Sequence, residues 1–398
     1  MYTLWPMLKR IVSGSLLVAG TTVGAGMLGI PLLTAKAGFW PGLGIIILAW
    51  AVMLWTGLLF LEATLWMPVG SNLLSMSKRF LGSKGRAFSG MMFLFLYYCL
   101  LVAYFAAGAP MLGLGIGKLV GIQMTGIWPY LLFGLIFGTI VGLGAKWIDR
   151  ANILLTAGLI SAYLLLIGLG AGEVDPQKFT FFDWPKAAFA MPVLFAAFGY
   201  HNIIPSLVTY FGKEKKAIRL SIVLGTTLAL VIYVIWQWLV LGIIPPEMIA
   251  EALREGKPVT AALQSVTGNF WIVVSGQLFA FFALITSLLG VAFSMVDFFA
   301  DGFKVERHGL KRLALTCITF FPPFALAVIY PTIFDRALGI AGGVGEAILN
   351  GLIPISFVWI GCYHKGLKSD LKLSRFNLGM TAFVIVVVMI LEVFNLIS

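Results

Sequence analysis

Long apolar segments dominate the chain, and charged residues are confined to short stretches between them. Several uncharged runs exceed the ~18 residues that a helix needs to cross a ~30 Å hydrocarbon layer, among them 11–35, 87–117, 187–212 and 220–246. Cutting the chain at its charged and Pro/Gly-rich stretches predicts eleven membrane helices, at about 11–36, 42–65, 90–110, 128–144, 151–171, 187–211, 221–244, 270–297, 312–331, 340–362 and 377–396. The pattern predicts an all-α polytopic membrane protein with residues 1–398 as one transmembrane domain.

Composition and charge agree with this prediction. Of the 398 residues, 60% are hydrophobic and 11% are charged, which excludes a water-soluble globule. Basic residues resist translocation and collect in cytoplasmic connections. With the N-terminus inside, those connections hold most of the 27 basic residues, namely Lys9, Arg10, Lys78, Arg79, Lys84, Arg86, Lys146, Arg150, Lys213, Lys215, Lys216, Arg219, Lys304, Arg307, Lys311, Arg312, Lys365, Lys368, Lys372 and Arg375. This predicts a cytoplasmic N-terminus, a C-terminus on the far side and no nucleic-acid partner.

The first apolar run carries an unusual density of glycine, in the segment GTTVGAGMLGIP. Gly20 and Gly24 form a small-xxx-small pattern that lets two membrane helices approach closely. Gly24, Ala25 and Gly26, however, point to different helix faces, and each glycine weakens a helix by ~1 kcal/mol. A break in the helix is the other interpretation, and it frees backbone groups that are tolerated in lipid only where they line a cavity.

Such a break would bind a zwitterion. An outer half-helix that begins near Gly26 and Met27 would direct free N–H groups and its positive dipole end at a carboxylate. Carbonyl groups between Gly20 and Val23 would suit an ammonium group or a small cation.

A second break is predicted in the sixth span, MPVLFAAFGYHNIIPSLVTY. Gly199 lies at its centre, His201 and Asn202 follow, and Pro205 removes a helical hydrogen bond. Interrupted helices at corresponding places in two halves indicate the substrate site of a transporter.

The segments GTTVGAGMLGIP, FGYHNIIPSL and LITSLLGVAFSMVDFFADG closely resemble the bacterial hydroxy and aromatic amino acid permeases. This is the tyrosine and tryptophan permease group of the amino acid–polyamine–organocation superfamily. The resemblance implies the leucine-transporter fold, with inverted repeats over about 11–171 and 187–363 and a peripheral helix over about 377–396. It also implies a single amino acid bound between the breaks in helices 1 and 6.

By this resemblance, the substrate carboxylate would meet the N–H groups of Ala25 and Gly26, and the ammonium group would meet carbonyls near Thr22 and Phe198. Gly199 would face a roomy apolar cavity. The expected substrate-binding residues are Thr22, Gly24, Ala25, Gly26, Tyr97, Tyr98, Tyr104, Phe195, Phe198, Gly199, His201 and Asn202. The tyrosines and phenylalanines are candidate walls for an aromatic ring, although such residues also serve in packing.

The coupling ion is expected to be a proton or sodium. Gly20, Val23, Ala283, Thr286 and Ser287 match the cation site of related transporters, although such hydroxyls often bond to their own backbone. Met27 stands where leucine transporters carry an asparagine ligand for a second sodium.

A proton carrier would be an ionisable group within the membrane. The candidates are Glu62, His201 and Glu346, with a structural role as the alternative for Glu62. Lys36 and Glu346 are also expected to pair at the outer gate. The segment 245–268 is expected to be a lid or a solvated connector.

The sequence thus predicts a secondary transporter that imports aromatic amino acids, tyrosine foremost, in a bacterial inner membrane. Serine or threonine is the alternative substrate, and an intramembrane enzyme is the alternative class. No cofactor or metal cluster is expected, and the only expected partners are the amino acid and membrane lipid, with the protein as a monomer.

Overall fold

The computed structural model describes residues 4–306 and 308–397, in which every regular element is helical. Nine of the described helices are long and apolar enough to cross a membrane, or ten when one bent pair is counted as a span. In chain order, the spans and shorter apolar helices are the bent pair α1 (Leu4–Thr22) and α2 (Gly26–Thr34), α3 (Phe39–Leu65), α4 (Leu73–Val120), α5 (Trp128–Leu143), α6 (Ala145–Gly170), the interrupted α8 (Met191–Ala197) and α9 (Ile204–Phe211), α10 (Lys215–Ile243), α13 (Phe270–Phe303), α14 (Gly309–Ile329), α15 (Phe334–Ile340) with its continuations η6 (Ala341–Leu352), α16 (Ile353–Trp359) and η7 (Ile360–His364), and α17 (Arg375–Ile397).

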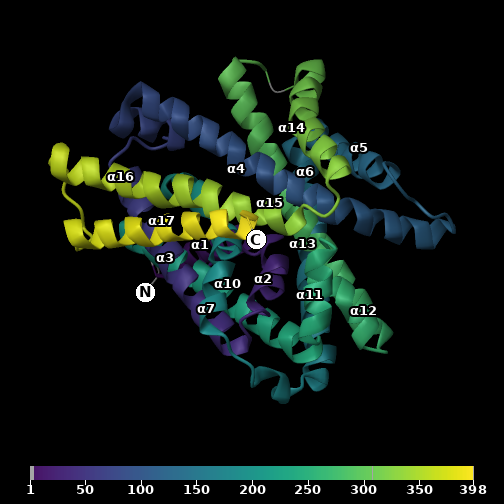
Figure 1. Cartoon of the computed structure of the whole chain (residues 1–398). Coiled ribbons are helices and arrows are strands. Elements are labelled where there is room, and N and C mark those ends of the chain that lie inside the picture. Colours follow the sequence, from purple (N-terminus) through teal and green to yellow (C-terminus); the bar gives the residue numbers. More distant parts are fainter. Residues whose placement is uncertain (1–3, 307, 398) are drawn as a thin grey trace.

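The helices follow the predicted order, and the chain is a multi-pass membrane protein. The count of eleven and the inverted repeat remain predictions, because α5 has only 16 residues and falls short of a full span. The last helix, α17, lies beside α16 at the edge of the bundle (Figure 1).

The third predicted helix is much longer than expected. The prediction of 90–110 is too short, because α4 has 48 residues and includes the basic segment that was assigned to a cytoplasmic connection. A capping box starts it, since the Asn72 side chain accepts a hydrogen bond from the Ser75 N–H and Ser75 Oγ accepts one from the Asn72 N–H. Gly82, with φ of 76°, kinks it and separates the first two turns from the membrane helix.

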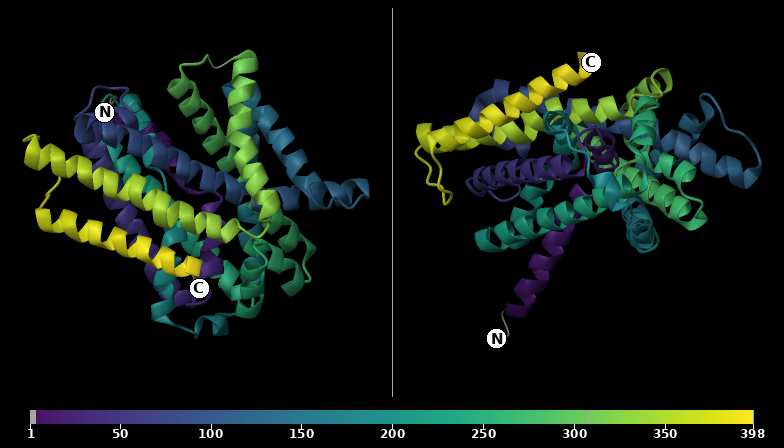
Figure 2. Two further views of the ribbon diagram at one scale, coloured as in Figure 1. Left: turned by 45° about the horizontal axis from the view of Figure 1, so that its top comes forward. Right: turned by 60° about the horizontal axis from the view of Figure 1, so that its bottom comes forward.

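Both predicted helix breaks are present. The axes of α1 and α2 differ by 59° across residues 23–25. Residues 198–200 interrupt the sixth span, after which the short helix η4 (His201–Ile203) leads into α9. Apart from its partner α2, α1 packs mainly on α10, and it projects from the bundle toward its N-terminus (Figure 2).

The connection between α10 and α13 covers one end of the molecule. It contains α11 (Pro246–Arg254), η5 (Val259–Ala262) and α12 (Leu263–Val266). Ile249 and Val259 are buried, and these elements pack on α2 and α13. The connector therefore has the packing expected of a lid.

Glycines allow η6 to pack tightly against α8 and α4. This segment forms wide π-helical turns, which often mark functional sites. A Cβ atom on Gly342 would overlap the carbonyl of Pro192, and one on Gly345 would lie 2.9 Å from Leu96 Cβ. The close contact between these spans therefore depends on the missing side chains.

We expect Gly342→Ala to lower the free energy of unfolding by about 1–3 kcal/mol, because the added methyl group must displace the Pro192 backbone. Thermal unfolding of the purified protein in detergent measures the effect. Gly379→Ala in α17 is the matched control, since no atom lies within 4 Å of its added methyl group. Equal melting temperatures for the two variants would show that this packing is not tight.

Candidate functional site

The break in the first span lies against two other helices. The Ala25 N–H donates a hydrogen bond to Ser287 Oγ on α13 at 3.1 Å. A Cβ atom on Gly26 would lie 2.7 Å from Ala197 Cα, and one on Gly24 would overlap the Ser287 hydroxyl. The broken helix is therefore present, and Gly24 and Gly26 pack closely at the break. The close packing predicted for the Gly20–Gly24 pair is not found at Gly20, since no atom lies within 4 Å of the position its Cβ would take.

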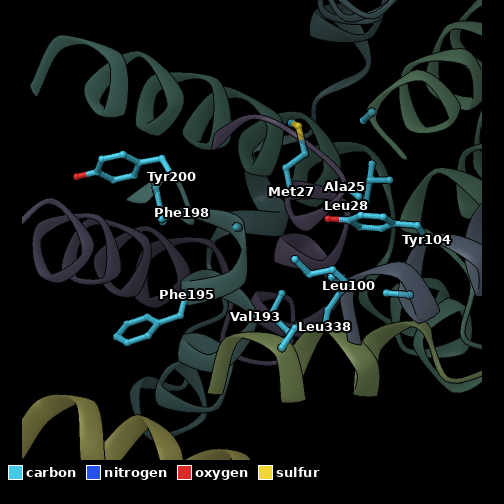
Figure 3. Packing of buried hydrophobic residues seen from close by; sticks show 14 of the residues in the cluster. Ala25, Met27, Leu28, Leu100, Tyr104, Val193, Phe195, Phe198, Tyr200 and Leu338 are labelled. Carbon is cyan, nitrogen blue, oxygen red and sulfur yellow. The ribbon is translucent and has the colours of Figure 1, made fainter. Parts of the chain in front are cut away.

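The second break brings Gly199 against a carboxyl group. A Cβ atom on Gly199 would lie 2.5 Å from Glu346 Oε1, so in this structure Gly199 faces Glu346 and not an open cavity. The neighbouring Tyr200 turns toward α3, where its hydroxyl donates to the Met53 carbonyl at 3.4 Å. In Figure 3, Phe195 and Tyr200 point away from Ala25 and Tyr104.

Helix α10 joins the two breaks. The Tyr233 hydroxyl lies 2.7 Å from the carbonyl oxygens of both Thr22 and Ala197, the last residues of α1 and α8. Its single proton can be donated to only one of them at a time. One turn further, Trp236 Nε1 donates to the Met27 carbonyl at 3.0 Å. Thus side chains of α10 are hydrogen-bonded to carbonyl groups on both sides of the first break.

The predicted aromatic walls divide into two groups. Tyr104 and Tyr97 are buried on one side of α4: Tyr104 interacts with Ser287, Tyr97 interacts with Asn202 and Ser294, and both lie near Glu346. The ring of Tyr104 points toward the segment that carries Ala25 and Leu28 (Figure 3).

The other aromatic residues lie outside this cluster. Tyr98 turns to α14, where its hydroxyl donates to the Ile318 carbonyl at 3.0 Å. Phe198 packs edge-on against Tyr233. Of the candidate tyrosines, Tyr104 therefore lies beside the first break, near Ser287, and Tyr97 beside the second, near Asn202.

The five residues of the predicted cation site have different surroundings in this structure. Thr286 donates to the carbonyls of Phe282 and Ala283 in its own helix, as the alternative interpretation supposed. Gly20 is exposed, and no atom lies within 4 Å of the position its Cβ would take. Val23 is half-buried, and Ser287 alone of the three α13 residues has a recorded hydrogen bond to the break, within the described part of the chain.

Glu62 lies in an ion-pair network at the end of the bundle that carries the basic connections. Its carboxylate accepts hydrogen bonds from Arg219 at 3.0 Å and from the Asp370 N–H at 2.9 Å. Lys215 donates a hydrogen bond to Asp370 and thereby lowers the pKa of that exposed carboxyl group. The network joins α3, α10 and the segment before α17, an arrangement that favours the structural alternative for Glu62.

The remaining ionisable candidates lie apart from one another. His201 is buried, its Nε2 lies 3.0 Å from Thr56 Oγ1, and its Nδ1 has no hydrogen-bond partner among the described residues. Lys36 is exposed, whereas Glu346 is buried and accepts a hydrogen bond from Asn350. The ion pairs recorded for the described residues do not include the expected Lys36–Glu346 pair.

Sequence reasoning missed four polar residues of this region: Tyr233, Trp236, Ser294 and Asn350. The first two could have been suspected from their spacing of one helical turn on an otherwise apolar span. Asn350 lies four residues after Glu346, which places both on one helix face.

Comparisons with known proteins match nearly the whole chain to one family. The model of the tryptophan/tyrosine permease family matches residues 7–397. The "Tyrosine-specific transport system 1" of Haemophilus influenzae is 31% identical over 358 residues and covers 88% of each chain. The "Tryptophan-specific transport protein" of the same organism is 32% identical over 369 residues, with 86% of each chain covered.

Two further likenesses come from Escherichia coli and from a solved structure. The "Low affinity tryptophan permease" of Escherichia coli K12 is 31% identical over 83% of this chain and 82% of its own. A crystal structure of MhsT in complex with L-phenylalanine has a TM-score of 0.63 at 16% identity, and the match covers 95% of this chain and 98% of the other. This last likeness shows the leucine-transporter type of fold.

Replacing Arg219 should destabilise the protein through Glu62. We expect Arg219→Met to lower the free energy of unfolding by about 3 kcal/mol, because it leaves the Glu62 carboxylate, 2% exposed, without its cation. Thermal unfolding in detergent measures the loss. Lys215→Met is the matched control, since it breaks an exposed pair worth at most about 1 kcal/mol. If both variants lost equally little stability, the burial of Glu62 would not depend on Arg219.

Removing the Tyr233 hydroxyl should cost about 1–3 kcal/mol, because buried carbonyl oxygens at the two breaks lose their donor. Tyr233→Phe is compared with Tyr98→Phe, whose hydroxyl makes an exposed hydrogen bond to another helix carbonyl. Thermal unfolding of the two variants should show a clear difference. An unchanged melting temperature for Tyr233→Phe would mean that the hydroxyl does not hold the breaks together.

Proposed function

The chain belongs to the tryptophan/tyrosine permease family, and on that premise we propose that it imports aromatic amino acids, tyrosine foremost, by proton-coupled symport. Membership in this family makes it an amino acid transport protein and not an enzyme. Its relatives are named for tyrosine or for tryptophan. The choice of substrate therefore depends on residues at the breaks.

The observation that carries the proposal is the meeting of two helix breaks with two buried tyrosines. The first turn of α2 presents backbone N–H groups and a positive dipole end, which suit a carboxylate. Ser287 Oγ, the present acceptor of the Ala25 N–H, is a neutral group that a carboxylate can replace. The carbonyl of Thr22 lies on the opposite side of the break and suits the ammonium group.

The side chains around this point suit an aromatic ring. Tyr104 and Tyr97 come from α4, and Leu100 lies between them on the same buried face. Aromatic rings pack edge-on or offset with contributions of about 0.5–1.5 kcal/mol beyond the burial of their surface. A serine or threonine side chain gains little from such walls, so the aromatic substrate is favoured over the hydroxy amino acids.

The exposure of the two ends fits one state of an alternating-access cycle. The lid segment covers the end near α2, and Met27 and Leu28 there are fully buried. Gly20 and Asn202, on the other side of the breaks, are exposed. With the N-terminus in the cytoplasm, as the basic residues predict, the site is accessible from the inside.

Uptake into proteoliposomes tests the proposal. We expect an inward-directed proton gradient to drive accumulation of labelled tyrosine, with tryptophan and phenylalanine as competitors and serine and threonine without effect. Tyr104→Ala should raise the KM for tyrosine by roughly tenfold, about 1.4 kcal/mol of lost contact. Tyr330→Ala, which alters an exposed tyrosine at the end of α14, should behave like the unaltered protein.

Three outcomes would contradict the proposal. Accumulation driven by a sodium gradient alone would show that sodium, and not the proton, is the coupling ion. Competition by serine or threonine, and not by the aromatic amino acids, would show that the protein is a carrier of hydroxy amino acids. Equal KM values for Tyr104→Ala and Tyr330→Ala would remove Tyr104 from the substrate site.

A further inference from the structure

We propose that Glu346 binds the coupled proton. The proposal rests on the proposed function, because it assigns a residue to the coupling of that transport. It is carried by the burial of Glu346, by its place beside the second break, and by the neutral character of its recorded hydrogen-bond partner.

Glu346 is a buried acid without a cationic partner. Its side chain is 4% exposed, and no ion pair recorded among the described residues involves it. Its partner is the neutral Asn350 amide, which donates a hydrogen bond to Oε2. Burial without a cation disfavours an ionised carboxylate, so the neutral, protonated form is favoured here.

The groups that surround Glu346 supply no compensating charge. Six elements pack on η6: α3, α4, α8, α15, α16 and α17. Helix α4 contributes the hydroxyls of Tyr97 and Tyr104, while α8 and α16 contain no ionisable residue. On α3, Glu62 is already paired with Arg219.

The other acids near this span lie against a different part of it. Glu392 on α17 contacts the positions of Gly339 and Gly343, and it interacts with Asn395 and with Asp335 of α15. Arg336 and Lys36 are near Asp335. These groups form a separate cluster, so Glu346 is the acid that faces the break.

Polar groups also lie on the side of the second break. The Tyr97 hydroxyl is near Glu346, Asn202 and Ser294. Asn202 is exposed and Ser294 is partly exposed, whereas Glu346 is buried. Water on that side therefore reaches the neighbourhood of Glu346 but not its carboxyl group in this structure.

Charge balance links this proton to the substrate. A bound amino acid is a zwitterion with no net charge, so an ionised Glu346 beside it would leave one uncompensated charge when the site closes. Closure with substrate therefore requires a proton on Glu346. In this structure, although the site is accessible from the inside, the Glu346 carboxyl group is still shielded from water. Once water reaches that carboxyl group, the proton passes to water and the carboxylate remains until a new proton arrives from outside.

The pH dependence of substrate binding tests this assignment. Tyrosine binding to the purified, unaltered protein in detergent should weaken with rising pH, by up to about tenfold per pH unit above the midpoint, because binding takes up one proton. In Glu346→Gln, which mimics the protonated acid, the Kd should change by less than about twofold between pH 6 and 8. Isothermal titration at several pH values measures both.

Glu392→Gln is the matched control. It neutralises another buried acid, on α17, that packs against the segment carrying Glu346, and it should keep the pH dependence. Should Glu346→Gln fail to fold, Glu346→Asp must shift the midpoint of the pH profile. The assignment is overturned if Glu346→Gln keeps the full pH dependence, if Glu392→Gln alone abolishes it, or if Glu346→Asp leaves the midpoint in place. If the unaltered protein binds no aromatic amino acid at any pH, the proposed function fails instead.

Discussion

Two stretches of peptide backbone inside the membrane depart from the regular helical hydrogen-bond pattern, and surrounding side chains supply partners for some of their groups. An unpaired amide or carbonyl in an apolar medium costs several kcal/mol. Ser287 accepts from the Ala25 N–H, Tyr233 donates to a carbonyl at the end of either half-helix, and Trp236 donates to the Met27 carbonyl. These partners come from α10 and α13, so helices distant in sequence determine where the first span can be interrupted. The same unsatisfied groups make the breaks suitable for a substrate that carries both a carboxylate and an ammonium group.

Small residues complement these hydrogen bonds by bringing the broken helices close to their neighbours. Gly26 lies against Ala197, which places the first break on the second, and Gly342 lies against Pro192 of α8. The same glycine-rich turns of η6 place Glu346 beside Gly199. The tight packing and the position of the buried Glu346 therefore have one cause, the absence of a side chain on the glycines at these contacts. A structure that needed only stability would not require a carboxyl group at this contact.

The sequence predicted the elements whose cause is local. Gly24 and Gly26 predicted the first break, and Gly199 with Pro205 predicted the second, because helix propensity and proline geometry act within a few residues. It could not place Glu346 beside Gly199, since that contact depends on packing between spans far apart in sequence. It also left Tyr97, Tyr98 and Tyr104 equivalent, although Tyr98 lies on a different face of α4 and meets α14. The sequence suggested Glu62 as a coupling residue because it could not show the ion pair with Arg219, which lies more than 150 positions away.

The position of the anchors also indicates which part of the first span can move. Both sides of its break are held at the breakpoint itself, by Tyr233 at Thr22 and by Ser287 at Ala25. The rest of α1 packs mainly on α10, and its Gly20 contacts no other element. Hinges in membrane transporters are residues at the ends of elements that absorb large changes of backbone angle. Residues 23–25 have this character, so α1 can turn about them while the hydrogen bonds at the break persist.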